Sequence, residues 1–383
     1  MKKSVIIFQN SFWGKNTKTS GGETRFVEIF SRIQNNFDGV IITNKDGRNL
    51  DETYKIKFKY IITPTIFDRF GAGISYLLRT AYVLFHLPNK NIDVVYSNSD
   101  FFPDVIPAFV LKLLRPKIKW VQCVFHIYQD WRVRPGNKII NLMAQLSQRI
   151  SLMLIRKANI VININKATGV ALCDSGIDSQ KIFINPVGID YERIQEVKKI
   201  KNQVWDAIYL GRINPSKGVF DLPEIWKTVI DTIPNAKLAI IGGGDINNIN
   251  KLKDTIEKYN IKKNIKFFGY LRNEDIYPTL KSAKIFVFPS HEEGFGIVIA
   301  EAMACGLPVI SWDLPVYKEV FEGKNISIPL GNTKKFSATV IEYLNSKRDR
   351  VRIGRQGANF IKKYSWEDIA KTELNLIEKY GLL

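Results

Sequence analysis

The chain has 383 residues, 45% of them hydrophobic and 24% charged, which is the composition of a globular protein with room for two domains of ordinary size. Its 56 basic and 37 acidic residues give a net charge of +19, so nucleic acid, anionic lipid headgroups and phosphorylated substrates are all compatible partners. Three cysteines without any CxxC spacing, Cys123, Cys173 and Cys305, argue against a disulfide framework or a zinc site and indicate a reducing, cytoplasmic setting.

The first half of the chain alternates strands with helices. Short apolar runs predict strands at residues 4–8, 40–43, around 61, 93–96, 120–125 and 160–164, with helices that include 74–86 and 166–175. Gly21 and Gly22 stand directly before a helical pattern at residues 24–34, which predicts a strand, a glycine loop and a helix. Glycines there allow a ligand to approach the backbone closely, although a plain turn with a cap explains them as well.

Two segments of this half, residues 101–120 and 138–157, mix large apolar side chains with lysine and arginine. A basic, aromatic helix can lie in the headgroup region of an anionic membrane. The alternative for the first segment, an ordinary amphipathic helix followed by a strand, is favoured. Because no uncharged stretch reaches the roughly 18 apolar residues of a membrane span, any membrane contact is expected to be peripheral, on the cytoplasmic face.

The second half continues the alternation, with strands predicted at residues 207–210, 238–241, 265–269 and 285–288. Arg212 and Lys217 occupy the loop after the first of these strands, just before a helix, so two cations and a helix dipole converge there. That arrangement suits a diphosphate, and a surface basic pair is the alternative. The glycines after the strand at 238–241, which include Gly243, fail the GxGxxG pattern at Asn247, so a nicotinamide site is not supported.

Residues 285–311 predict a strand, a loop, a helix and a second strand. In parallel sheets, ligands bind beyond the carboxyl ends of the strands, at helix N-termini that attract anions. Glu293 falls in the loop, and Glu301 falls inside an otherwise apolar helix, where a carboxylate needs a hydrogen-bonding partner such as a ribose or sugar hydroxyl. Two exposed glutamates are the alternative reading.

The pattern Glu293-Gly294-Phe295-Gly296, followed by Glu301-Ala-Met-Ala-x-Gly-x-Pro-Val, resembles the retaining glycosyltransferases of family 4. The resemblance is dense over residues 206–308 and loose before residue 187. It implies the GT-B fold, in which two Rossmann-like, doubly wound α/β domains face each other across a cleft. The implied parts are an acceptor-binding domain at 1–187, a nucleotide-sugar-binding domain at 188–365 and a C-terminal helix at 366–383 that returns to the first domain.

The resemblance also implies roles for individual residues. Glu293 would meet the hydroxyls of the donor sugar, Glu301 the nucleotide ribose, and Arg212 and Lys217 the diphosphate. His126, at the carboxyl end of the strand at 120–125, would lie beside the anomeric centre, although a lone histidine is more often structural and the acidic residue that usually follows it is replaced by Ile127. The remaining donor-binding positions that it implies are Gly21, Gly22, Gly211, Gly243, Tyr270, Leu271, Gly294, Phe295 and Gly296.

The expected reaction moves a hexose-type sugar, with retention, from a nucleotide-diphosphate sugar to a glycan or lipid-linked acceptor, with no cofactor. A UDP-sugar is favoured on family frequency alone. No two aspartates stand two positions apart as in an Asp-x-Asp metal site, so Arg212, Lys217 and the helix N-terminus at Gly296 are expected to replace a metal ion. Alternatives are a sugar-nucleotide epimerase of the same fold and a non-enzymatic basic module that binds lipid or nucleic acid; nucleic acid is not the expected partner.

Overall fold

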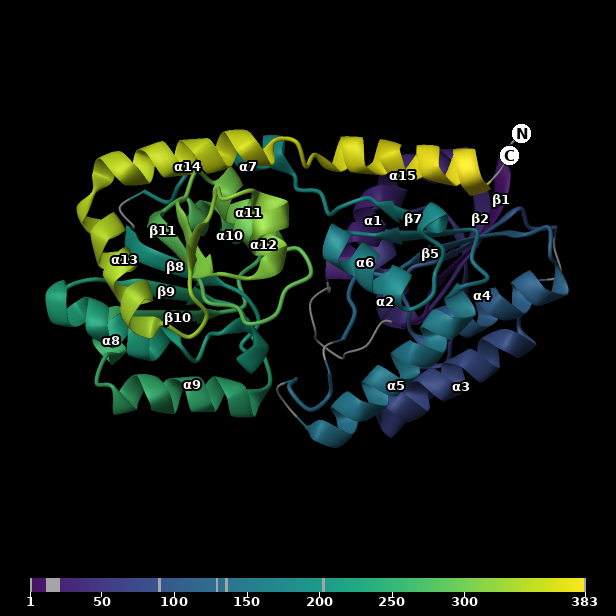
Figure 1. The fold of residues 1–383 in the computed structure, drawn as a ribbon, viewed down its shortest axis with the longest axis horizontal. Helices are drawn as coiled ribbons and strands as arrows, with labels where there is room; N and C mark the ends of the chain where they lie inside the picture. The colour runs from purple at the N-terminus through teal and green to yellow at the C-terminus, as the bar shows by residue number, and fades with distance from the viewer. Residues whose placement is uncertain are drawn as a thin grey trace. The chain divides into compact units, whose positions relative to one another are not determined.

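The computed structural model describes residues 2–11, 21–88, 91–128, 130–134, 137–201 and 204–381. The chain forms two compact units. Unit 1 contains residues 1–188 together with 366–383, and unit 2 contains residues 189–365. Each unit is a parallel β-sheet covered by helices (Figure 1).

The sheet of unit 1 has seven described strands in the order β3-β2-β1-β4-β5-β6-β7, and all neighbouring pairs are parallel. The strands are β1 (Lys3–Gln9), β2 (Phe37–Thr43), β3 (Lys59–Ile62), β4 (Val94–Ser97), β5 (Lys119–Cys123), β6 (Ile160–Asn163) and β7 (Ile182–Ile184). The α-helices are α1 (Gly21–Ile33), α2 (Lys45–Thr53), α3 (Gly71–Phe85), α4 (Phe102–Leu114), α5 (Lys138–Ile155), α6 (Lys166–Asp174) and α15 (Trp366–Gly381). The order of the strands reverses direction between β1 and β4, which makes their carboxyl ends the switch point of this sheet.

Helices cover both faces of this sheet because successive side chains of each buried strand point to opposite sides. Ile6 and Phe8 of β1 face the cluster that α4 and α5 complete. On the other face, Phe30 of α1 packs edge-to-face on Tyr96 of β4, with ring centroids 4.9 Å apart. Helix α15 packs along α1, as Figure 1 shows.

A fully buried ion pair fastens α15 to the rest of unit 1. Arg25 Nη2 lies 2.6 Å from Glu373 Oε2, and neither side chain is exposed. Glu373 also accepts hydrogen bonds from Tyr96 and Asn185, while Arg25 donates to the backbone of Asn185 and Pro186. The charges are therefore hydrogen-bonded on all sides, as burial requires.

The sheet of unit 2 has six described strands, also parallel, in the order β10-β9-β8-β11-β12-β13. The strands are β8 (Trp205–Leu210), β9 (Leu238–Ile241), β10 (Ile265–Gly269), β11 (Ala283–Phe288), β12 (Val309–Trp312) and β13 (Ile326–Ile328). The α-helices are α7 (Tyr191–Glu196), α8 (Leu222–Thr232), α9 (Ile246–Lys258), α10 (Asn273–Leu280), α11 (Ile297–Ala304), α12 (Pro315–Phe321), α13 (Thr333–Asn345) and α14 (Lys347–Ile361). The switch point of this sheet lies between β8 and β11.

Three details differ from the sequence predictions. The strand at 160–164 is not the last of the first half, because β7 follows as a three-residue edge strand that stops before Asn185 and Pro186. Gly21 and Gly22 open helix α1 instead of forming a loop before it. Lys217 ends a 3-10 turn, and helix α8 begins only at Leu222.

The segment at 101–120 is an ordinary domain helix followed by a strand, the favoured alternative, since α4 buries Val105, Ala108 and Leu111 against the sheet. Across the described ranges, none of the helices combines the length and the apolar character that crossing a bilayer demands.

Candidate active site

Two loops meet at the switch point of unit 2. One follows β8 and carries Lys217, and the other follows β11 and carries Glu293. Lys217 Nζ lies 2.7 Å from Glu293 Oε1 and donates a second hydrogen bond, of 3.0 Å, to the carbonyl oxygen of Glu292. The side chains are 17% and 12% exposed, so the pair remains within reach of a ligand. The sequence motifs in these two loops thus come together in space.

Close backbone packing holds the two loops in register. Gly218, directly after Lys217, has a φ of +65°, and a Cβ atom at this position would lie 1.5 Å from the carbonyl oxygen of Pro289. The backbone N–H of His291 donates to the carbonyl of Ser216 at 2.9 Å. Only glycine combines that backbone angle with so close an approach, so residue 218 sets the distance between the lysine and the glutamate.

The imidazole of His291 supplies a second link between these elements. Its Nε2 lies 2.9 Å from Oδ2 of Asp221, which also accepts a 3.1 Å hydrogen bond from the indole of Trp312. Asp221 precedes α8, and Trp312 ends β12. His291 is therefore a positioning residue for the loop that carries Glu293.

Neutral hydroxyl groups surround the carboxylate of Glu293. Ser290 Oγ lies 3.1 Å from Glu293 Oε1. Burial raises the pKa of Tyr209 and of Tyr317 well above the usual value, and the nearby charge of Glu293 adds to both shifts. Both phenols stay neutral at physiological pH, which leaves Lys217 as the cation that balances Glu293 in this cluster.

The second predicted glutamate lies on α11, which begins directly after Gly296, a residue with a φ of +94°. Glu301 Oε1 accepts a 2.9 Å hydrogen bond from the hydroxyl of Tyr277 on α10. Burial raises the pKa of Glu301 to about 7, and the hydrogen bond from Tyr277 opposes that shift. A half-buried carboxylate of this kind has unused acceptor capacity and would gain from a hydroxyl-bearing ligand.

Comparison with known proteins bears directly on this unit. Residues 190–360 match the family model described as "Glycosyl transferases group 1", which covers nearly all of unit 2. Unit 2 is a glycosyl transferases group 1 domain. This confirms the resemblance to a glycosyltransferase family that was drawn from Glu293, Glu301 and their flanking residues.

Two curated relatives match part or most of the chain. A GDP-mannose-dependent monoacylated alpha-(1-6)-phosphatidylinositol monomannoside mannosyltransferase of Corynebacterium glutamicum is 30% identical over 179 residues, which is 44% of this chain and 45% of that protein. The uncharacterized glycosyltransferase MJ1069 of Methanocaldococcus jannaschii is 23% identical over 319 residues, or 78% of each chain. The matched segment spans less than half the length of the first relative and of three other curated glycosyltransferases.

A solved structure covers both units. The crystal structure of Anabaena Alr3699/HepE in complex with UDP and glucose matches 98% of this chain and 100% of its own, with a TM-score of 0.77 and 16% identity. At that identity the likeness shows the fold. It confirms the predicted GT-B fold class with two doubly wound α/β domains.

Other predicted residues of the glycosyltransferase domain line the same end of its sheet. Gly211 and Gly243 follow β8 and β9, and the N–H of Ile213 donates to the carbonyl of Gly243 at 2.8 Å. A Cβ atom at Gly243 would lie 2.2 Å from the ring of Tyr270, so that ring rests on the glycine backbone. Leu271 follows Tyr270 in the loop after β10.

Three further residues of the motifs are placed differently from one another. Arg212 is exposed, and within the described residues its side chain makes no ion pair, so its guanidinium is available to a ligand. Phe295 is buried, with its ring 5.4 Å from that of Tyr364. Its side chain therefore packs inward, and Phe295 and the half-buried Gly294 would meet a donor through the backbone.

The remaining predicted residues belong to unit 1. A Cβ atom at Gly22 would lie 2.9 Å from the ring of Phe125, so the first turn of α1 packs directly on the segment after β5. His126 follows in that segment, with its ring 5.8 Å from that of Tyr128 and its carbonyl bonded to Gln148 of α5 at 2.8 Å. Gly21, Gly22 and His126 thus gather at the carboxyl end of the first sheet.

Sequence reasoning missed three side chains, Ser290, Tyr277 and Asp221, that hold Glu293, Glu301 and the loop residue His291 in place. Ser290 lies inside the motif loop and could have been selected, because a buried serine beside a carboxylate is a natural donor. Tyr277 and Asp221 contact Glu301 and His291 across 24 and 70 positions of the chain. Local spacing carries no signal for contacts of that kind.

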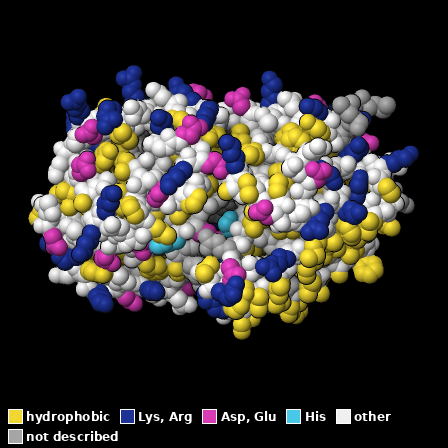
Figure 2. All heavy atoms as spheres, in the orientation of Figure 1, with side chains coloured by type: hydrophobic (Ala, Val, Ile, Leu, Met, Phe, Trp, Pro, Cys, Tyr) yellow, Lys and Arg dark blue, Asp and Glu magenta, His cyan; other side chains and the backbone are white. Residues whose placement is uncertain are grey.

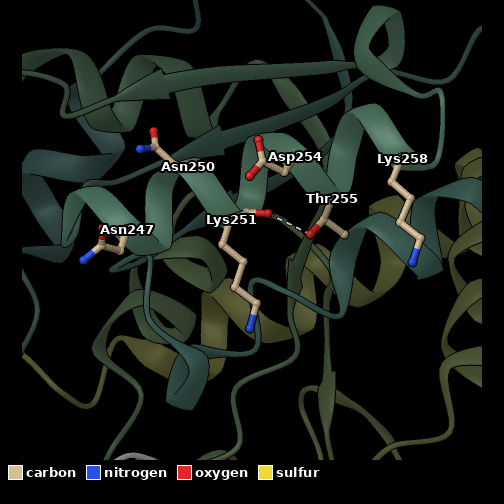
Figure 3. Close-up of a pocket in the computed structure, with 6 residues that line it drawn as sticks. All are labelled: Asn247, Asn250, Lys251, Asp254, Thr255 and Lys258. Carbon is tan, nitrogen blue, oxygen red and sulfur yellow. Dashed lines mark hydrogen bonds between the residues drawn. The ribbon is translucent and has the colours of Figure 1, made fainter.

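Two further observations concern the described residues as a whole. No three His, Cys, Asp or Glu side chains among them are grouped so as to hold a metal ion. A hollow along α9 is lined by Asn247, Asn250, Lys251, Asp254, Thr255 and Lys258 (Figure 3). All six residues come from one helix, and the hydroxyl of Thr255 is bonded to the backbone of Lys251, so the hollow is a furrow on the helix surface and contains none of the predicted site residues.

Proposed function

We propose that the chain is a retaining glycosyltransferase that moves a hexose-type sugar from a nucleotide-diphosphate sugar to a hydroxyl of a glycan or a lipid-linked acceptor, without a metal ion. The observation that carries this proposal is the pair formed by Lys217 and Glu293, 2.7 Å apart at the switch point of the glycosyltransferase domain. A cation for a phosphate and a carboxylate for sugar hydroxyls stand side by side where open α/β sheets bind their ligands.

The leaving group decides what the site has to stabilise. The bond between the anomeric carbon and the diphosphate oxygen breaks, and the nucleoside diphosphate leaves with an additional negative charge. The acceptor oxygen forms its bond to the anomeric carbon on the same face, and its proton passes to a diphosphate oxygen. Lys217, the exposed guanidinium of Arg212 and the N-terminus of α11 would stabilise the charge that develops, as preorganised groups do in such reactions.

The two glutamates have separate roles in this proposal. Glu293 accepts hydrogen bonds from the donor sugar and is held by Lys217 and Ser290. Glu301, with a pKa raised to about 7 by burial, accepts from the ribose hydroxyls and is steadied by Tyr277. Tyr270 and Leu271 contact the base, and Gly211 and Gly243 belong to the loops that bind the nucleotide, where Gly243 makes room for the ring of Tyr270.

Unit 1 would supply the acceptor side of the reaction. His126 lies beside the anomeric carbon in this proposal, and Gly21 and Gly22 allow the donor phosphates or the acceptor to approach the start of α1. The charge of +19 suits anionic or lipid-linked acceptors. The three cysteines are free, in keeping with a cytoplasmic site of action.

The similar proteins differ in the base and the sugar of the donor. The name of the C. glutamicum relative specifies GDP-mannose, whereas the Anabaena structure contains UDP and glucose. We propose a UDP-sugar. An assay therefore has to include donors of both bases.

The test incubates the protein with a panel of UDP- and GDP-sugars, with EDTA, and measures release of the nucleoside diphosphate with and without membrane lipid extract. Release from one donor that is increased by lipid and abolished in Glu293→Gln is the expected result. Glu257→Gln is the matched control, because Glu257 forms an ion pair of the same 2.7 Å length on the surface of α9. Loss of activity in EDTA would contradict the metal-independent reaction.

Two outcomes of that assay point to the alternatives. Conversion of the donor into an epimer without an acceptor would identify a sugar-nucleotide epimerase. Absence of turnover with every donor, together with no binding of UDP or GDP in calorimetry, would favour the non-enzymatic module.

A further inference from the structure

Unit 1 exposes an unusual amount of hydrophobic surface on two helices. We call it the apolar face of α3 and α5; it consists of Phe70, Ile74, Leu77, Phe85, Ile139, Ile140, Met143, Leu146, Ile150 and Met153. Phe85 is 86% exposed and Ile140 66%. Figure 2 shows hydrophobic side chains gathered over α3 and α5, which are labelled in Figure 1. Scattered apolar residues are normal on a protein surface, but a continuous patch marks an interaction site.

The exposed apolar residues recur at helical spacing, so they form one continuous face on each helix. On α5 the exposed residues recur at 139, 143, 146, 150 and 153, and on α3 at 70, 74, 77 and 85, which is one face of each helix. The opposite, buried side of α3 carries Ser75, Arg79 and Thr80, and that of α5 carries Asn141, Gln148 and Ser151. The buried sides also carry the core residues Val83, Leu152 and Ile155, so what sets these helices apart is an outer face that is apolar where a helix that faces water is polar.

Hydrogen bonds from the buried polar residues fix the rotation of both helices. Arg79 donates to the carbonyl of Asn10 at 3.0 Å and pairs with Asp68. Gln148 donates to Asp100 at 2.6 Å and to the carbonyl of His126 at 2.8 Å. Turning either helix to hide its apolar face would leave these buried groups without hydrogen-bond partners, which is unfavourable.

The charged residues on the two helices have one sign. Neither α3 nor α5 contains an aspartate or a glutamate. Lys138, Arg149 and Lys157 are exposed on or beside α5, and Arg69 is exposed just before α3. Apolar side chains that enter the acyl boundary, flanked by cations at the headgroup level, are the pattern of a helix that lies in a membrane interface.

From this combination we propose that the apolar face of α3 and α5 docks on an anionic lipid bilayer. A second copy of the chain is a poorer occupant, because a two-fold interface brings the same patch together from both sides and would oppose Arg149 and Lys138 with no carboxylate on either helix to pair with them. Anionic headgroups supply the missing counter-charge. The proposal goes beyond glycosyl transfer and does not depend on it.

Helix α5 gives the surface a consequence for the site. Its inner side holds the segment after β5 through Gln148 and the carbonyl of His126, while its outer side carries the apolar face. If the proposed function also holds, the bilayer would bring lipid-linked acceptors to the unit that carries His126.

The test measures co-sedimentation of the full chain with vesicles of phosphatidylcholine alone and of an equimolar mixture of phosphatidylcholine and phosphatidylglycerol. We expect binding to the mixture, weakened by added salt. The double substitution Ile140→Glu with Met143→Glu should lower the partition coefficient at least about tenfold, since it removes buried apolar area and adds like charge to the anionic surface. Arg149→Glu should lower it by a smaller factor.

Matched controls keep the result interpretable. Ile246→Glu with Val351→Glu alters two residues of unit 2 that are 62% and 61% exposed, and it should leave vesicle binding unchanged. Unchanged thermal unfolding and UDP binding of all variants would show that they are folded. The proposal would be overturned if the wild type and the Ile140→Glu, Met143→Glu variant bound vesicles equally. It would also be overturned if the wild type bound vesicles equally well with and without phosphatidylglycerol.

Light scattering in solution distinguishes the other occupant. If the wild type is a dimer that does not bind vesicles, and the Ile140→Glu, Met143→Glu variant is a monomer, the face is an interface with a second copy. Donor turnover is measured separately, so failure of lipid binding and failure of the proposed reaction are told apart.

Discussion

One ion pair of each unit differs sharply from the other in its environment. In unit 2, Lys217 and Glu293 join two loops at the end of the sheet, with 17% and 12% of their side chains exposed. In unit 1, Arg25 and Glu373 are fully buried and join α1 to the last helix of the chain. A ligand can exchange partners with the first pair but cannot reach the second. We therefore expect the first pair to serve binding and the second to serve folding.

The same contrast extends to the surfaces of the two units. Unit 2 presents polar loops and matches the glycosyl transferases group 1 model. Unit 1 places many of its polar side chains inside and presents the apolar face of α3 and α5 outside. Under the two proposals, unit 2 offers fixed charges to a nucleotide sugar, whereas unit 1 offers an apolar surface to lipid.

The largest effect is expected from breaking the buried pair. Glu373→Ala leaves the charge of Arg25 buried without its partner, which should destabilise unit 1 by about 3–5 kcal/mol. Amide hydrogen exchange measured by peptide would show faster opening of β1, β4 and β5, with β8 and β11 unchanged. Glu378→Ala, an exposed residue of the same helix, is the control. Unchanged exchange in β1 would show that the pair does not hold unit 1 together.

Breaking the partly exposed pair of Lys217 and Glu293 should lower the rate of donor turnover and leave the free energy of unfolding nearly unchanged. Lys217→Ala removes a preorganised cation and should lower the rate of nucleoside diphosphate release by about 10²–10³-fold. Lys262→Ala breaks an ion pair of the same 2.7 Å length at the surface and should have no such effect. An equal loss of rate in both variants, or a loss of stability in Lys217→Ala as large as that of Glu373→Ala, would remove the distinction between the pairs.

The spacing of the two loops can be tested through the glycine between them. Gly218→Ala and Gly331→Ala both place a side chain at a positive φ, +65° and +79°, where about 1–2 kcal/mol of strain is expected. Only Gly218→Ala also meets backbone, at Pro289, because nothing lies within 4 Å of a Cβ atom at Gly331. Urea unfolding should show a further loss of about 1–3 kcal/mol for Gly218→Ala, with reduced donor turnover. Equal losses would mean that the loops adjust freely.

The smallest effect concerns Glu301 and pH. Because burial raises the pKa of Glu301 to about 7, the carboxylate that would accept from the ribose is lost as the pH falls through that value. Affinity for UDP, measured by calorimetry, should fall about tenfold between about pH 8 and about pH 6.

Two variants test that assignment. Glu301→Gln should lose this pH dependence and keep only the titration of UDP itself. Tyr277→Phe removes a hydrogen bond that favours the ionised carboxylate, so the fall in affinity should begin at a higher pH. An identical profile in all three proteins would show that Glu301 does not meet the nucleotide.

Much of the fold could be predicted from continuous apolar runs bounded by glycine and proline. The strands at 238–241 and 265–269 have the bounds expected from the sequence. The edge strands β7 and β13 have three residues each, too few for a periodic signal.

In the candidate site, too, local sequence patterns identify residues but do not predict the contacts between distant parts of the chain. The motif residues Lys217 and Glu293 can be identified from the sequence, but their contact cannot, because they stand 76 positions apart in the chain. Segments 101–120 and 138–157 have similar composition, yet only the second exposes an apolar helix face along most of its length. The inward hydrogen bonds of Gln148 decide that difference, and they exist only after folding.

The path of the chain through the two units affects the order in which they can fold during synthesis. The chain leaves unit 1 after Gly188, forms the whole of unit 2, and returns at Trp366. On the ribosome, Arg25 emerges hundreds of residues before Glu373, so the guanidinium has no carboxylate partner while unit 2, which is continuous, can already fold. The unit that is synthesised first is therefore the one that is finished last, a reversal of the usual N-terminal-first order.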